Sequence, residues 1–118
     1  MATILVVDDQ RQICIMIATV LENEGFSVLT ATSGSEALQI ARSWPGGLDL
    51  LLSDIEMPGM DGATLVQQLR AESAGLPVIL MSGTCDLAAL RVSKPARFLP
   101  KPFSMTELAQ IARAMVQA

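Results

Sequence analysis

The chain has 118 residues, of which 51% are hydrophobic and 17% are charged, a length and composition that exclude a disordered segment and predict one compact domain over residues 1–118. Its formal net charge is −4 and its eight Lys and Arg residues are scattered, which argues against direct nucleic-acid binding. The first apolar run, residues 4–7, is too short for a signal peptide or a membrane span, so we predict a cytoplasmic protein.

Two residue types narrow the chemistry further. The chain contains no histidine, so it cannot itself carry a phosphohistidine. Cys14 and Cys85 lie far apart without the spacing of a metal site, and we expect both to be reduced thiols.

The first half of the chain alternates strand and helix patterns. Residues 4–7 form a continuous apolar run typical of a buried strand, and residues 28–31 predict a second, weaker strand. Between them lies an amphipathic helix that ends at Gly25. A capping box at residues 33–36 predicts a second helix through about Arg42. The apolar face of the first helix consists of Ile13, Ile17, Val20 and Leu21.

The second half continues the alternation. Residues 50–52 and 78–81 predict buried strands around a third helix, and residues 98–99 predict a weaker fifth strand. A short fourth helix is predicted after Asp86, and a second capping box at residues 104–107 opens the last helix. The inward faces are Leu65, Val66 and Leu69 in the third helix, and Met105, Leu108, Ile111, Ala112 and Met115 in the last.

The element order is therefore strand and helix repeated five times. This order predicts an α/β fold in which parallel strands are joined by right-handed crossovers. Among known doubly wound (βα)5 folds, a five-stranded parallel sheet has the flavodoxin-like order 2-1-3-4-5, and we expect that order here.

Polar residues follow four of the five predicted strands. Asp8 and Asp9 follow the first strand, Asp54 the third, Ser82 the fourth and Lys101 the fifth. Ligands of such sheets bind beyond the carboxyl ends of the strands, so these side chains are expected to meet in one crevice. Singly, each has an ordinary explanation: Asp9 or Asp54 as a helix or turn cap, Ser82 as a loop residue, Lys101 as a solvated lysine. Their coincidence at one edge favours a site.

The chemistry of such a crevice can be stated in physical terms. Clustered carboxylates repel one another unless a cation is present, and oxygen ligands without His or Cys suit Mg²⁺. An aspartate can act as a nucleophile toward phosphorus, and the charge that develops can be neutralised by Mg²⁺, the Lys101 ammonium and the Ser82 hydroxyl.

Four stretches of the chain resemble the receiver domain of bacterial response regulators. They are ILVVDD at residues 4–9, DLLLSDIEMPGMDG at 49–62, PVILMSG at 77–83 and FLPKPF at 98–103. Together they run almost from end to end of the chain. The resemblance implies a phosphoryl-accepting switch of a two-component system.

The resemblance also implies roles for individual residues. Asp54 would accept the phosphoryl group, and Asp8, Asp9, Asp54 and the backbone carbonyl of Glu56 would hold Mg²⁺. Lys101 would contact the phosphoryl oxygens, and the Lys101–Pro102 peptide would be cis. Asp54 phosphorylation and dephosphorylation would be catalysed by the domain itself, without turnover of an external substrate.

The implied switch combines Ser82 with an aromatic partner, Phe98, and changes the face formed by the short helix after Asp86, the fifth strand and the last helix. Side chains at Glu56 and Thr84 could affect the hydrolytic water. The implied partners are a histidine kinase or histidine phosphotransfer domain and an effector domain or downstream protein. The segment between Ser82 and Lys101 is shorter than is usual in the family, which predicts a short or distorted fourth helix.

Other readings remain open at this point. The main alternative is a receiver-fold interaction module that is never phosphorylated, because fold alone does not determine function. A phosphohydrolase would leave Asp8 and Asp9 unused, a flavin-binding domain would need a stacking pocket that Trp44 is not placed to form, and a P-loop nucleotidase would need a Gly-x-x-x-x-Gly-Lys motif that the chain lacks.

Overall fold

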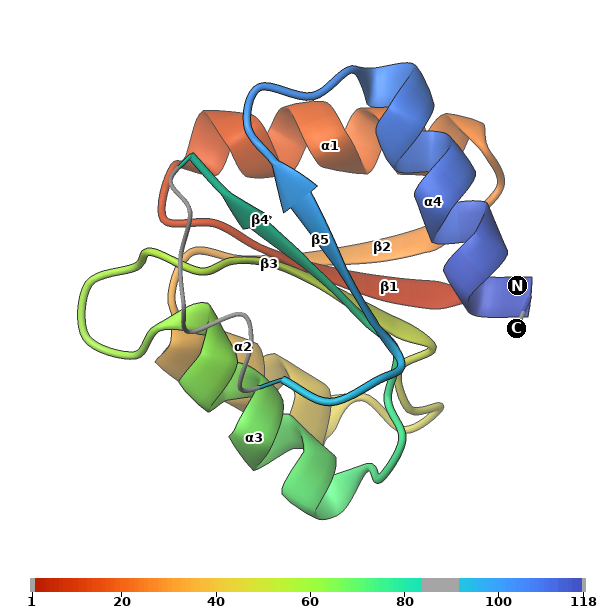
Figure 1. Cartoon of the computed structure of the whole chain (residues 1–118). Helices are drawn as coiled ribbons and strands as arrows, with labels where there is room; N and C mark the ends of the chain where they lie inside the picture. Colours follow the sequence, from red (N-terminus) through yellow and green to blue (C-terminus); the bar gives the residue numbers. More distant parts are fainter. Residues whose placement is uncertain (1, 84–91, 118) are drawn as a thin grey trace.

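The computed structural model, which describes residues 2–83 and 92–117, contains one five-stranded parallel sheet with the strand order β2-β1-β3-β4-β5. The predicted α/β fold and strand order are thus confirmed. Helices α1 and α4 cover one face of the sheet, and α2 and α3 cover the other (Figure 1). The strands are β1 (Thr3–Val7), β2 (Ser27–Ala31), β3 (Leu50–Asp54), β4 (Val78–Ser82) and β5 (Ala96–Pro100), and the helices are α1 (Arg11–Asn23), α2 (Gly34–Ser43), α3 (Gly62–Glu72) and α4 (Met105–Gln117).

The three central strands are buried along their whole length. Every residue of β1, β3 and β4 is buried, because helices cover both of their faces. This is why their sequences are nearly continuous apolar runs. The edge strands β2 and β5 are mostly half-buried or exposed, which explains their weaker sequence patterns.

Alternate residues of the central strands point into two separate cores. Leu5 and Leu51 pack with the apolar faces of α2 and α3, whereas Ile4 and Leu50 pack with those of α1 and α4. This division follows from the two-residue period of a strand. The two cores hold the central strands rigidly, so the residues at their carboxyl ends are held in fixed positions.

The helix ends follow the predicted capping signals. Ser33 Oγ accepts a hydrogen bond from Glu36 N at 3.1 Å at the start of α2, and Ser104 Oγ accepts one from Glu107 N at 3.0 Å at the start of α4. Gly25 has φ 97° just beyond the end of α1, a conformation that favours glycine.

The entry into β5 is attached to α3 by one arginine. Arg70 donates hydrogen bonds to the carbonyl oxygens of Leu76 at 2.9 Å, Ser93 at 2.6 Å and Pro95 at 2.9 Å. These bonds satisfy backbone acceptors just before β4 and just before β5. They also fix the start of the strand whose far end leads to Lys101.

Several predictions concern residues that the structure does not describe. The helix expected after Asp86 lies outside the described residues, as do Thr84 and Cys85. The same is true of the part that this helix would contribute to the face predicted to change on phosphorylation. Within residues 2–83 and 92–117, none of the helices combines the length and the apolar character needed to cross a membrane.

Candidate functional site

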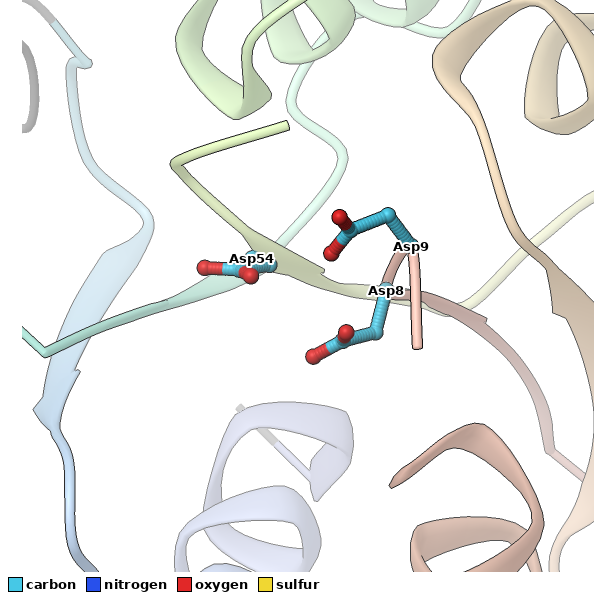
Figure 2. A group of neighbouring side chains, drawn as sticks. All are labelled: Asp8, Asp9 and Asp54. Atoms are coloured by element: carbon cyan, nitrogen blue, oxygen red, sulfur yellow. The ribbon is translucent and has the colours of Figure 1, made fainter. Parts of the chain in front are cut away.

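Three carboxylates meet at the carboxyl edge of the sheet. β1 and β3 are paired in parallel with Val7 opposite Ser53, so Asp8 and Asp54 continue two neighbouring strands side by side. Asp9 follows Asp8 on the loop that leads to α1. One carboxylate oxygen from each of the three residues lies within 4.8 Å of the others (Figure 2). The predicted convergence of these residues is present in the structure.

The cluster is buried on one side and open on the other. Asp8 is fully buried and Asp54 is 5% exposed, whereas Asp9 is exposed to solvent. Asp8 Oδ1 accepts a hydrogen bond from Gln10 N at 2.9 Å. Within the described part of the chain, the buried Asp8 Oδ2 has no hydrogen-bond donor. A ligand that supplies positive charge could therefore reach the cluster from the side of Asp9.

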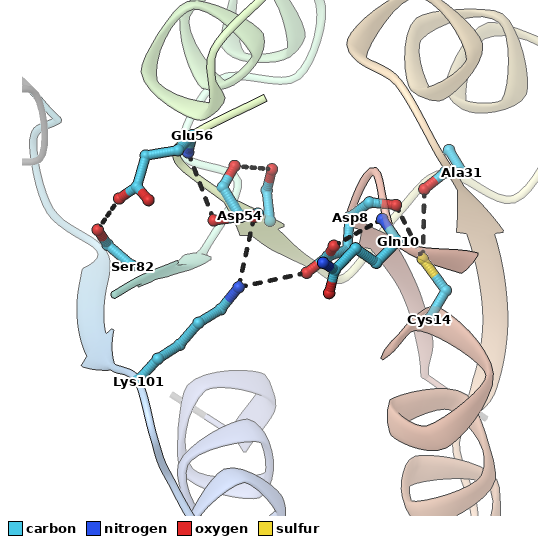
Figure 3. Close-up of polar contacts among 9 residues, drawn as sticks. Asp8, Gln10, Cys14, Ala31, Asp54, Glu56, Ser82 and Lys101 are labelled. Atoms are coloured by element: carbon cyan, nitrogen blue, oxygen red, sulfur yellow. Dashed lines mark hydrogen bonds and ion pairs between the residues drawn. The ribbon is translucent and has the colours of Figure 1, made fainter. Parts of the chain in front are cut away.

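Lys101 brings a positive charge to the cluster from the end of β5. Its Nζ lies 3.4 Å from Asp54 Oδ2 and 3.6 Å from Asp8 Oδ2 (Figure 3). Its backbone N donates to Ser82 O at 2.7 Å, which extends the pairing of β4 and β5 by one step. The Lys101–Pro102 peptide is cis, as predicted.

The charges of these groups do not balance. Burial raises the pKa of Asp54 above its ordinary value, Lys101 opposes this rise, and the neighbouring Asp8 carboxylate adds to it. The pKa is raised on balance because one shared ammonium does not compensate for the loss of water around Asp54 and the charge of Asp8. The site therefore has an excess of negative charge.

The donor set fits a hard divalent cation. The cluster offers carboxylate oxygens without nitrogen or sulfur ligands, and the buried Asp8 Oδ2 has an ion pair with Lys101 but no hydrogen bond within the described residues. Glu56 follows Asp54 by two residues, and its backbone N lies 3.4 Å from Asp54 Oδ1, which places its backbone beside the cluster.

The simpler explanations fail for Asp9 and Ser82 and hold in part for Asp54. The residue that caps α1 is Gln10, and α3 is capped by Asp61, whose Oδ1 accepts from Thr64 N at 2.8 Å. Asp9 and Asp54 are therefore not helix caps, although Asp54 Oδ1 accepts from Glu56 N at 3.4 Å and so caps the turn after β3. Ser82 is the last residue of β4 and is 1% exposed, so it is not an ordinary loop residue.

Two contacts at this edge were not predicted from the sequence. The Ser82 hydroxyl donates a hydrogen bond to Glu56 Oε1, whereas the roles predicted for Glu56 were a backbone ligand and an effect on water (Figure 3). Cys14 Sγ lies 3.3 Å from Asp8 O and 3.5 Å from Ala31 O, and burial raises the pKa of its thiol. Nothing in the sequence pattern indicates either contact, because each depends on side chains that meet only after the sheet has formed.

Phe98 and Trp44, the two aromatic residues considered in the sequence, lie outside the acidic cluster. Phe98 is on β5 and 40% of it is exposed. Trp44 ends α2, and Figure 1 places this end of α2 away from the carboxyl edge that carries Asp54. A ring-stacking pocket at the acidic cluster is therefore not formed by Trp44.

Comparison with known proteins identifies the family. Residues 4–113 match the response regulator receiver domain, so the chain belongs to the response regulator receiver domain family. It is 38% identical over 120 residues to the sensor kinase CckA of Brucella abortus, covering 98% of this chain and 13% of CckA. It is 40% identical over 115 residues to the DNA-binding transcriptional regulator NtrC of Escherichia coli, covering 93% of this chain and 24% of NtrC.

A solved relative shows the same fold with a ligand. The response regulator TrrA of Thermotoga maritima, crystallised in complex with Mg²⁺-BeF, superposes with a TM-score of 0.83 at 30% identity, covering 98% of this chain and 99% of TrrA. The chain thus spans a small part of the curated relatives CckA and NtrC but nearly all of this receiver structure.

Proposed function

We propose that Asp54 accepts a phosphoryl group from a phosphohistidine on a histidine kinase or histidine phosphotransfer domain, in a Mg²⁺-dependent reaction. The observation that carries this proposal is the Asp54 carboxylate itself, which lies within 4.8 Å of Asp8 and Asp9 and 3.4 Å from the Lys101 ammonium. The donor is a separate domain or protein, because this chain contains no histidine. Family membership supports the same assignment.

The transfer is a displacement at phosphorus. A carboxylate oxygen of Asp54 forms a bond to phosphorus while the P–N bond of the donor breaks, and the electron pair of that bond returns to the imidazole. Lys101 contacts an oxygen of the group in transit and neutralises part of its charge. The product is an acyl phosphate on Asp54.

A divalent cation completes the charge balance. Asp8, Asp9, Asp54 and the Glu56 backbone carbonyl are the groups that would hold Mg²⁺, which when bound neutralises negative charge on the phosphoryl oxygens. The excess negative charge of the cluster and the Mg²⁺-BeF complex of the relative TrrA support this ligand.

The new dianion on Asp54 would act as a switch. It attracts the Ser82 hydroxyl, and Phe98 and the helical face beside β5 respond to that movement. The readers of this face would be an effector domain or a downstream protein, as the kinase and transcription-regulator relatives suggest. The chain as a whole, residues 1–118, would act as one receiver domain that changes its own phosphorylation state and turns over no external substrate.

Acetyl phosphate gives a direct test. Incubation with acetyl phosphate and Mg²⁺ should add one acid-stable, base-labile phosphoryl group, detected by intact mass, as the acetate leaves with the electrons of its O–P bond. Asp54→Asn should abolish the addition, whereas Asp49→Asn, at the other end of β3, should leave it intact. An unmodified wild-type chain would support the interaction module, and rapid release of inorganic phosphate would support a hydrolase.

A further inference from the structure

The Ser82 side chain has a charged partner in the unphosphorylated protein. Its hydroxyl is buried at the end of β4 and donates a hydrogen bond to Oε1 of Glu56, a residue on the exposed loop after β3 (Figure 3). In the same view Lys101, not Ser82, is the group directed at the Asp54 carboxylate. Ser82, the candidate switch residue, and Asp54, the candidate acceptor, therefore contact different partners.

The backbone around Ser82 is fixed by the sheet. Ser82 O accepts from Lys101 N at 2.7 Å, Ser82 is paired with Pro100 of β5, and the preceding Met81 O accepts from Ile55 N at 2.9 Å. With its backbone held on both sides, Ser82 changes hydrogen-bond partner mainly by rotation about its Cα–Cβ bond, among the staggered positions of a serine. A hydroxyl has one proton to donate, so it serves one of two strong acceptors at a time.

We propose that Glu56 is a positioning residue that holds the Ser82 hydroxyl in the unphosphorylated state and competes with the phosphoryl group on Asp54 for it. The proposal rests on the proposed function, in which Asp54 is the acceptor. Because the carboxylate is a charged acceptor, its bond to Ser82 stabilises the unswitched form. A ligand at Asp54 that must accept a hydrogen bond from the Ser82 hydroxyl then binds with a lower apparent affinity. The relative reduction equals the fraction of molecules in which Ser82 is bonded to Glu56.

Glu56 would also lower the affinity for such a ligand through its charge. Its negative charge lies near the acidic cluster and would repel a phosphoryl dianion whether or not Ser82 is present. A single substitution at Glu56 removes both effects at once. The two explanations are separated by a double-mutant cycle, which isolates the part of the effect that depends on both side chains.

The experiment measures the affinity of beryllofluoride, a phosphoryl mimic, in saturating Mg²⁺ by calorimetry. The variants are Glu56→Ala, Ser82→Ala and the double variant. Glu22→Ala, at an exposed position on α1, is the control for loss of a carboxylate elsewhere. Glu56→Ala should tighten binding about tenfold more in the presence of Ser82 than in its absence, within the range of couplings between contacting residues. Glu22→Ala should leave the affinity unchanged.

Each result has a defined meaning. Equal effects of Glu56→Ala with and without Ser82 would overturn the proposal and leave Glu56 as a simple charge, while the acceptor role of Asp54 would stand. Absence of beryllofluoride binding and of acetyl phosphate labelling in the wild-type chain would overturn both. A second readout needs no Ser82 variant: the Ser82 χ1 rotamer, measured by NMR without ligand, should change in Glu56→Ala, and an unchanged rotamer would contradict the contact.

Discussion

Lys101 shares one ammonium between two carboxylates. Its Nζ is 3.4 Å from Asp54 and 3.6 Å from Asp8, both of which we propose as Mg²⁺ ligands. Removing this charge should have opposite effects on metal binding and on phosphoryl transfer. Lys101→Met should bind Mg²⁺ about tenfold more tightly, because a unit charge a few ångströms away is worth at least about 1 kcal/mol. Phosphorylation by acetyl phosphate should fall by at least about 100-fold, because a contact to the transferring group is lost.

The control for this variant is the other lysine of the chain. Lys94 is exposed and precedes β5, at the opposite end of the strand from Lys101. Lys94→Met makes the same chemical change and should alter neither the Mg²⁺ affinity, followed by calorimetry, nor the labelling rate. Weaker Mg²⁺ binding in Lys101→Met would show that the lysine organises the acidic cluster rather than competing with the metal.

The raised pKa of Asp54 has a consequence for stability. An aspartate whose pKa is higher in the folded than in the unfolded state makes the ionised folded form less stable at pH values above that raised pKa. Without divalent cations, Asp54→Asn should therefore raise the melting temperature at pH 7, because the neutral amide avoids the burial of a charge. The gain should shrink as the pH falls through the raised pKa toward 3.8, the ordinary value.

Thermal melts across this pH range provide the measurement. Asp49→Asn is the matched control, since Asp49 Oδ2 accepts a hydrogen bond from Thr3 N at 2.8 Å. Replacing this charged acceptor by a neutral amide should weaken the bond and lower the melting temperature. A lower melting temperature for Asp54→Asn at pH 7 would mean that the Lys101 ion pair outweighs the burial of Asp54.

Most of the acidic cluster was predictable because it depends on backbone position alone. Asp8, Asp54 and Lys101 each end or directly follow a strand, and the ends of parallel strands share one edge. The Glu56–Ser82 bond was not predictable, because the two residues are 26 positions apart and meet only through particular side-chain rotamers. The Cys14 contact with Asp8 O likewise requires the seating of α1 on the sheet, which the apolar pattern of a helix does not specify to within a hydrogen bond.

At the level of elements, the start of α3 is packed directly on the end of β3. A Cβ atom on Gly62 would lie 2.5 Å from Asp54 O and 3.0 Å from Ile55 Cα, and Gly62 N donates to Ile55 O at 2.9 Å. Gly62→Ala should therefore cost about 2 kcal/mol of unfolding free energy in urea, because the clash is with backbone that cannot move aside. This loss would occur although alanine is the better helix former.

Gly46→Ala is the comparison for this substitution. Its added Cβ would lie 3.6 Å from Trp44 Nε1, an ordinary contact, so stability should change by less than about 0.5 kcal/mol. Gly62→Ala with wild-type stability would mean that α3 can shift away from β3 without cost.

Helix α1, which follows Asp9 in the chain, presents two exposed apolar side chains. Ile15 is 58% exposed and Met16 is 46% exposed, one turn or more beyond Asp9, and a face of this kind suits contact with a protein donor. Ile15→Asp should lower phosphorylation by a phosphohistidine domain at least about tenfold, as loss of an interface anchor does. Labelling by acetyl phosphate should be unchanged, since that donor needs no docking surface.

The same charge placed elsewhere on α1 tests the location of the surface. Asn23→Asp, at the last residue of the helix, should leave both reactions at wild-type rates. Equal loss of acetyl phosphate labelling in Ile15→Asp would show damage to the site itself and not to docking.

The accuracy of the strand predictions followed burial. β1, β3 and β4 were recognised because they are buried on both faces, whereas β2 and β5 were weaker predictions because their residues at the sheet edges are partly exposed. For β5 the prediction covered residues 98–99, and the strand extends over Ala96–Pro100 because pairing with β4 imposes extended backbone on polar and proline residues alike.

For the molecule as a whole, the single tryptophan reports on folding without reporting on the site. Trp44 ends α2 away from the acidic cluster. Adding Mg²⁺ at constant temperature should leave its emission unchanged, while the melting temperature followed by the same emission should rise. The free energy of unfolding should increase by about 2.7 kcal/mol when Mg²⁺ is at about 100 times its Kd. A strong quench by Mg²⁺ in the folded protein would contradict this placement.

The sheet order also explains why the cation of the site needs a long side chain. β4 lies between β5 and β3, and strands are spaced by about 4.8 Å, so an amino group that starts beside β5 must cross roughly 10 Å to meet a carboxylate on β3. The four methylene groups of lysine cover most of this gap, and the aspartate side chain covers the remainder. A histidine in the same position would stop short of the carboxylates, so strand spacing, as much as charge, limits which residue can serve there.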